Sequence, residues 1–120
     1  MTVASAGMIA PIGATEYGIR FLPVSGLPIG VLPAPQQVYS DDVFLLDPFT
    51  TIIFTSDGIV EAQNESGELF GFDRLENTIL EIVSERKAKT IVDYIIDTTQ
   101  KFVGQAEQND DMTVVVVVKT

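Results

Sequence analysis

The sequence contains no cysteine and no histidine, and only 7 of its 120 residues are lysine or arginine. The absence of cysteine excludes disulfides and thiolate nucleophiles. The absence of histidine excludes imidazole-based catalysis and the usual zinc sites with nitrogen and sulfur ligands. Carboxylates, hydroxyls, a few basic side chains and the backbone remain available for chemistry.

The formal net charge is −10. A surface of this sign repels nucleic acid and attracts hard cations, so we expect no nucleic-acid partner. No apolar run approaches the ~18 residues of a membrane-spanning helix, and the N-terminus lacks the basic region of a signal peptide. We therefore expect a single domain over residues 1–120, outside the membrane.

Short apolar segments predict β-strands at residues 17–22, 43–46 and 51–56. Residues 23–37, rich in proline and glycine, predict an ordered loop. The five consecutive valines at 114–118 show no alternation, which predicts a strand covered on both faces or at least deeply buried.

Two helices are expected between these strands. From Asp73 onward, Leu75, Ile79, Ile82 and Val83 fall on one helical face. A second helix is expected from about Thr90, ending at Gly104, because glycine tolerates the left-handed conformation at a helix C-terminus. The predicted fold class is α+β, with short strands first, then two helices, then a final strand that returns to the sheet.

Two carboxylate sites lie at the ends of predicted strands, one at a C-terminal end and one at an N-terminal end. Asp57 follows the strand at 51–56, and Asp110 precedes the valine strand. If those strands are antiparallel neighbours, both residues meet at one edge of the sheet. A shared proton or a divalent cation would relieve their repulsion, and with oxygen ligands only the expected cation is Mg²⁺ or Mn²⁺. The alternative is that Ser-Asp-Gly is only a turn and Asn-Asp-Asp only a loop.

The spaced segments FTSDGIVEAQNESGELFGFDRL and QNDDMTVVVVV resemble the metal-dependent protein phosphatases of the protein phosphatase 2C type, in particular the stage II sporulation protein E-like group. The matching elements are Ser56-Asp57-Gly58, Glu61-Ala62, Gly67-Glu68-Leu69-Phe70-Gly71 and Asp110-Asp111-Met112-Thr113. The segments SGLPIGVL and ASAGMIAPI are also similar to segments of that group.

The resemblance implies a sandwich of antiparallel sheets flanked by helices, of which this chain would form a part. It also implies a two-metal centre that activates water to attack a phosphoserine or phosphothreonine. By the resemblance, Asp57 and Asp110 would be catalytic metal ligands, Asp111 would orient water or a ligand, and Gly58 would permit the tight turn. The implied substrate is a phosphorylated regulatory protein such as an anti-sigma-factor antagonist in the bacterial cytoplasm.

The sequence also departs from the family pattern. It corresponds to the C-terminal part of the family domain, without the early segment that supplies the Asp-rich metal-bridging motif. Met8 replaces a family histidine, and Phe49-Thr50 replaces a Gly-Asp pair. A sheet without its early strands would keep an open edge, so we expect the chain to form a homo-oligomer or to pair with a separate N-terminal half.

Three functions are compatible with these residues. The chain could be a phosphatase domain, as a fragment or one half of a split enzyme. It could instead be a catalytically inactive phosphatase-like module for protein–protein interaction. The third possibility is a globular α+β domain whose acidic loops only confer solubility.

Overall fold

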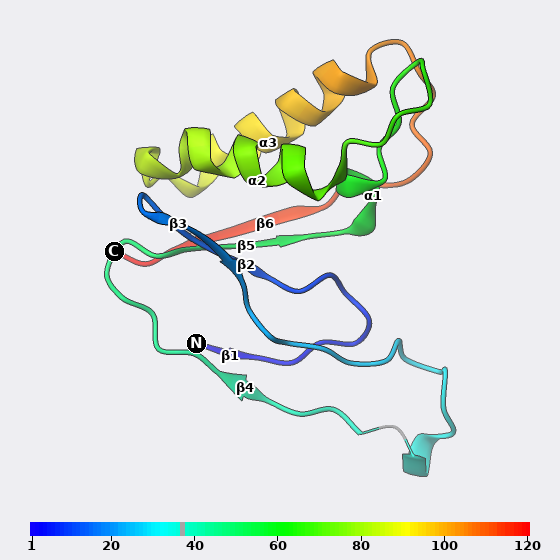
Figure 1. The fold of residues 1–120 in the computed structure, drawn as a ribbon. Helices are drawn as coiled ribbons and strands as arrows, with labels where there is room; N and C mark the ends of the chain where they lie inside the picture. The colour runs from blue at the N-terminus through cyan, green and yellow to red at the C-terminus, as the bar shows by residue number, and fades with distance from the viewer. Residues whose placement is uncertain (37) are drawn as a thin grey trace.

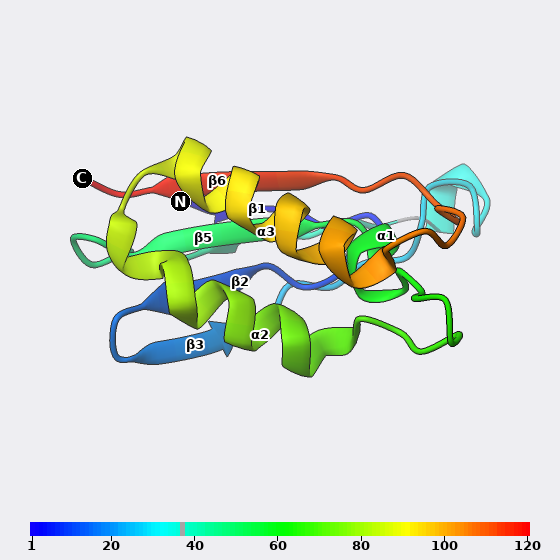
Figure 2. The same cartoon turned by 90° about the horizontal axis from the view of Figure 1, so that it is seen from above.

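The computed structural model describes residues 1–36 and 38–120 and arranges them in layers (Figures 1 and 2). A layer of helices covers one face of a four-stranded sheet, and a small two-stranded sheet lies on the other side. The strands are β1 (Thr2–Val3), β2 (Ile12–Thr15), β3 (Gly18–Phe21), β4 (Asp42–Val43), β5 (Thr51–Thr55) and β6 (Val114–Val118). The helices are α1 (Asp57–Val60), α2 (Gly71–Ile82) and α3 (Ala88–Val103), with 3₁₀ turns η1 (Ala34–Gln36) and η2 (Val83–Glu85).

The larger sheet has the strand order β3-β2-β5-β6, and every neighbouring pair is antiparallel. The register of β5 and β6 runs from Thr51 opposite Val118 to Thr55 opposite Val114. The β-branched β5 is buried at four of its five positions, as a central strand requires. The expected α+β class and the antiparallel pairing of β5 with β6 are therefore confirmed.

The main core lies between this sheet and the helices. Its fully buried side chains each contribute about 1.5–3 kcal/mol through removal from water. The hydroxyl of Thr99, buried in α3, donates a hydrogen bond to the Ile95 carbonyl at 2.8 Å, so no polar group is stranded there. The largest members of the core are Ile12, Ile53, Ile59, Leu75, Ile79, Ile91 and Ile95.

Both expected helices are present with shifted starts. α2 begins at Gly71, so Asp73 lies inside its first turn. α3 begins at Ala88 and is capped by Gly104, whose φ of 64° lies in the left-handed region that glycine favours. The sequence did not predict α1, which turns residues 57–60 into a short helix directly after β5.

Two strand predictions require correction. The valine strand is not covered on both faces, because β6 is an edge strand whose residues alternate between half-buried and exposed. Of the strand predicted at 43–46, only Val43 lies in β4, which pairs Asp42–Val43 with β1. Phe44 and Leu46 instead pack from outside that strand against a small second cluster.

The segment at 23–37 is a loop with the short η1 turn over the part that the structure describes; Gln37 lies outside the described residues. It packs against the N-terminal loop at Gly26, where an added Cβ would lie 1.9 Å from the Ser5 carbonyl oxygen. The segments 4–12 and 25–32, both similar to the phosphatase group, therefore contact each other.

The side chains of Phe49 and Arg86 stack on each other, and both residues have an unusual backbone conformation. Their φ angles are 68° and 53°, in the left-handed region that costs a non-glycine residue free energy. The Arg86 guanidinium lies 4.2 Å from the centre of the Phe49 ring, and Glu16 lies 3.7 Å from the same guanidinium. The resembled family has glycine at the position of Phe49, which is the residue that a positive φ favours.

The two smallest replacements of Phe49 should differ in stability. Phe49→Ala loses the cation–π contact and keeps the strained backbone, whereas Phe49→Gly loses the same contact and removes the strain. We expect the free energy of unfolding of Phe49→Gly to exceed that of Phe49→Ala by about 1 kcal/mol. Urea unfolding of both variants measures the difference. An alanine variant as stable as the glycine variant would contradict the strain argument.

Candidate metal centre

Ser56 joins the end of β5 to the loop that leads into β6. Its backbone N–H donates to the Thr113 carbonyl at 3.0 Å. Its hydroxyl accepts from the Thr113 N–H and donates to the Asp111 carbonyl, each at 3.0 Å. These bonds extend the ladder past the last paired residues and fix the loop at 111–113 beside residue 56.

Asp57 is the first residue of α1, and its side chain is exposed. Helix α1 is held in place by its apolar side, because Ile59 is fully buried in the core and Val60 is nearly so. The Glu61 N–H closes the turn on the Asp57 carbonyl at 2.8 Å. The chain turns from strand β5 into helix α1, whose inner side packs in the core and whose first residue, Asp57, faces water. The apolar strand is therefore followed directly by an exposed carboxylate.

Gly58 allows the two segments to approach closely. It is buried, and a Cβ added to it would lie 2.2 Å from the Asp111 carbonyl oxygen and 3.5 Å from the carbonyl carbon of Asp110. Its φ is not in the left-handed region, so close backbone contact, rather than a tight turn, explains this glycine.

Asp110 and Asp111 are both exposed, in the loop before β6. The Asp110 Oδ1 accepts a hydrogen bond from the Asp111 N–H at 2.7 Å, and Gln108 Nε2 donates to the Asp110 carbonyl at 2.8 Å. Residues 57–58 and 110–111 thus lie side by side at one edge of the sheet, as the antiparallel pairing required. Among residues 1–36 and 38–120, none forms an ion pair or a side-chain hydrogen bond with Asp57.

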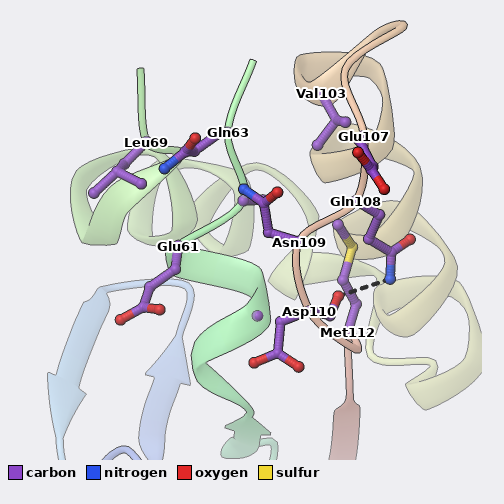
Figure 3. A pocket seen from close by; sticks show the side chains of 11 residues that line it. Glu61, Gln63, Leu69, Val103, Glu107, Gln108, Asn109, Asp110 and Met112 are labelled. Atoms are coloured by element: carbon purple, nitrogen blue, oxygen red, sulfur yellow. Dashed lines mark hydrogen bonds between the residues drawn. The ribbon is translucent and has the colours of Figure 1, made fainter. Parts of the chain in front are cut away.

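A cavity of about 410 Å³ opens beside Gly58 and Asp110 (Figure 3). Its apolar lining includes Leu69, Val103 and Met112, and its carboxylates come from Glu61, Glu107 and Asp110. None of the described residues that line it is basic. Asp57 precedes the lining residue Gly58 in the sequence, but its own side chain is not part of the cavity lining.

The sequence analysis did not identify Glu107, which follows the α3 cap. It matched Glu61 as part of the Glu61-Ala62 element of the resemblance but assigned it no role at the site. Both are exposed, and in the part of the chain that the structure describes their side chains make no hydrogen bond or ion pair. The only signal in the sequence was the accumulation of Glu, Gln and Asn around 105–109, which a solvated loop would show equally.

The donor chemistry at this edge fits a hard divalent cation. Carboxylate oxygens are what Mg²⁺ and Mn²⁺ prefer, and both favour several bound waters. Within residues 1–36 and 38–120, no three acidic side chains are grouped so that they could hold a metal ion. Asp57 and Asp110 would therefore hold a cation with water in most coordination positions.

The family model described as Stage II sporulation protein E matches residues 1–119 of the chain. No curated protein matches the sequence. Among the described residues, no helix combines the length and apolar character needed to cross a lipid bilayer.

Three solved structures share the fold at low sequence identity. The SiaA-PP2C domain of Pseudomonas aeruginosa has a TM-score of 0.78 at 19% identity, covering 99% of this chain and 46% of its own. The PP2C phosphatase domain of SpoIIE from Bacillus subtilis, with a fragment of its regulatory domain, has a TM-score of 0.71 at 20% identity, covering 99% and 33%. The RsbU and RsbW domains of Rv1364c from Mycobacterium tuberculosis score 0.66 at 21% identity, covering 98% and 32%. The chain thus spans less than half the length of each of these three structures.

Replacing Gly58 tests the contact that holds the two acidic segments together. In a helix, Gly→Ala alone stabilises by about 1 kcal/mol. Here the added methyl group collides with the Asp111 carbonyl, so we expect Gly58→Ala to lower the free energy of unfolding by about 1–3 kcal/mol instead. Urea unfolding distinguishes the two signs. A more stable alanine variant would mean that the loop at 110–111 does not pack against α1.

Proposed function

Because the chain belongs to the stage II sporulation protein E family, we propose that it forms the C-terminal part of a metal-dependent protein serine/threonine phosphatase domain. The observation that carries the proposal is the close approach of Gly58, the neighbour of Asp57, to the backbone of Asp110 and Asp111 at one sheet edge. That contact gathers oxygen donors in a protein that lacks histidine and cysteine, so carboxylate-held metal is the chemistry still open to it.

In this proposal Asp57 and Asp110 are the metal ligands. A bound Mn²⁺ or Mg²⁺ would supply an activated water and would neutralise phosphate oxygens. Asp111, fixed through its carbonyl by the Ser56 hydroxyl, orients water or substrate with its side chain. Gly58 keeps the two segments close enough for both carboxylates to serve one site.

The choice of metal has support from a further solved neighbour. A crystal of the Bacillus subtilis SpoIIE phosphatase domain presoaked with Mn has a TM-score of 0.59 at 16% identity, covering 98% of this chain and 50% of its own. We propose that the remaining ligands belong to the family's N-terminal segment, because two carboxylates leave most coordination positions to water.

The proposed substrate is a phosphorylated regulatory protein. The matched structures include phosphatase domains of SpoIIE and of SiaA, and the RsbU domain of Rv1364c occurs in one structure with an RsbW domain. By the family resemblance, an anti-sigma-factor antagonist is the substrate class that we propose, in a cytoplasmic signalling role.

A second candidate is a phosphatase-like module that binds proteins without catalysis. The observation that favours it is the lack of a three-carboxylate group among the described residues. The two candidates differ in turnover rather than in fold, so metal binding and hydrolysis have to be measured separately.

Metal binding should depend on both proposed ligands. We expect calorimetry to show one weak Mn²⁺ site, with a Kd of about 10⁻⁴–10⁻³ M, as in low-affinity carboxylate sites. Asp57→Asn and Asp110→Asn should each weaken it by about tenfold or more, because each removes one of two anionic ligands. Asp41→Asn, an equal charge change at an exposed loop residue, is the matched control. Equal weakening in all three variants would mean non-specific attraction to an acidic surface.

Hydrolysis tests the catalytic step itself. We expect Mn²⁺-dependent release of p-nitrophenol from p-nitrophenyl phosphate that disappears in Asp57→Asn and Asp110→Asn and persists in Asp41→Asn. The reason is that activation of water requires the cation to be held beside the substrate. If the chain binds Mn²⁺ through both carboxylates but gives no turnover, this chain has no independent catalytic role.

A further inference from the structure

The loop that joins α1 to α2 is closed by its own hydrogen bonds. Its two ends meet where the Phe70 N–H donates to the Ala62 carbonyl at 2.8 Å. Between them, the Asn64 Oδ1 accepts from the N–H groups of Ser66 and Glu68, at 3.0 and 2.9 Å. Asn64 Nδ2 also donates to the Glu68 carboxylate at 2.8 Å. These contacts lie within the loop, so the loop fixes its own shape.

One side chain of this loop, Glu65, reaches the segment that follows α3. Its Oε1 accepts a hydrogen bond from the Gln105 N–H at 3.0 Å, across 40 positions of the sequence. The N–H groups on either side, of Gly104 and Ala106, bond instead to carbonyls of α3 at 3.0 and 3.2 Å. The Glu65 carboxylate thus satisfies a backbone donor that α3 does not satisfy.

Charge alone does not explain the position of Glu65. Its Oε1 lies beside Gly104 at the C-terminal end of α3, where the helix dipole is negative and disfavours a carboxylate. None of the ion pairs among the described residues includes Glu65. The hydrogen bond to the Gln105 N–H therefore explains the contact, and an uncharged acceptor of the same length could also make it.

The segment that leads from α3 to β6 is attached to the rest of the chain near both of its ends. Glu65 holds Gln105 near its start, and the Ser56 hydroxyl bonds the Asp111 carbonyl near its end. Asp110 lies between the two attachments, with an exposed side chain. Both loops lie at the end of the molecule where α1 lies (Figure 1). Loss of the Glu65 attachment would leave Asp110 on a segment whose first part is less restrained.

The same hydrogen bond joins the two walls of the cavity described above. Gln63 and Leu69 line the cavity from the loop that carries Glu65, and Asn109 and Asp110 line it from the opposite segment (Figure 3). The Glu65 contact therefore restrains the distance between the walls as well as the start of the segment that carries Asp110.

We propose that Glu65 is a positioning residue for Asp110. The proposal rests on the proposed function, in which Asp110 is a metal ligand, and Glu65 itself contacts neither the cation nor the substrate. By restraining the segment before the cation binds, Glu65 reduces the conformational freedom that the Asp110 carboxylate loses on binding. Part of the affinity for the cation consequently depends on a hydrogen bond at the far end of the segment.

Two variants of Glu65 separate positioning from attraction by charge. Glu65→Ala removes both the acceptor and the charge, and we expect it to weaken Mn²⁺ binding by about three- to tenfold, through the loss of one hydrogen bond. Glu65→Gln removes the same charge but keeps an acceptor oxygen, so we expect its Kd to stay within about twofold of wild type. The EPR signal of free Mn²⁺ measures both Kd values. Glu85→Ala, the same truncation at an exposed residue before α3, is the matched control and should bind Mn²⁺ like wild type.

Backbone order in the metal-free chain tests the same contact independently of the phosphatase proposal. In ¹⁵N relaxation measurements, wild type and Glu65→Gln should show rigid amides at 105–110, with order parameters of about 0.85. The order parameters of the same amides in Glu65→Ala should fall toward about 0.6, because the segment loses its first attachment. Amides elsewhere should be alike in all three chains, which checks that the alanine variant is folded.

The two measurements together decide between positioning and its alternatives. A glutamine variant that loses as much Mn²⁺ affinity as the alanine variant would mean that Glu65 acts by its charge. Unchanged backbone order or unchanged Mn²⁺ affinity in Glu65→Ala would also overturn the proposal. A wild-type chain that binds no Mn²⁺ would count against the proposed metal site, and the order parameters would then still decide whether Glu65 restrains the segment.

Discussion

The hydrogen bonds of Ser56 to the loop before β6 are the constraint on which the candidate site depends. They prolong the pairing of β5 and β6 beyond the last strand residues and hold residues 111–113 against the start of α1. Gly58 completes this arrangement by leaving room for the Asp111 carbonyl. Two acidic segments far apart in sequence thereby become neighbours, which neither the helices nor the core alone would achieve.

The core and the site have separate roles in this arrangement. Ile53 and Ile59, fully buried on either side of the turn, fix the backbone through apolar packing. The carboxylates of Asp57 and Asp110 stay in water, where keeping like charges near each other costs little. A cation held there would relieve the remaining repulsion.

The sequence predicted the parts of the fold that follow from periodicity and strand ends. The β-branched run at 51–55, the apolar stripe of α3 and the cap at Gly104 each have a local physical cause, and each is confirmed. Exposure of β6 could not be predicted, because five valines look alike whether a neighbour covers them or not. The four-residue helix α1 and the position of Glu107 beside the cavity depend on tertiary packing, and no local spacing in the sequence predicts them. The roles of Asp57, Asp110 and Asp111 stay predictions.

The most direct test of the account is anomalous diffraction from crystals soaked with Mn²⁺. The account predicts an anomalous peak between the side chains of Asp57 and Asp110, with oxygen atoms of both carboxylates as ligands and water in the other positions. A peak held by Glu61 or Glu107 without Asp57, or no peak between the two aspartates at saturating Mn²⁺, would contradict the central claim that this sheet edge is a metal site.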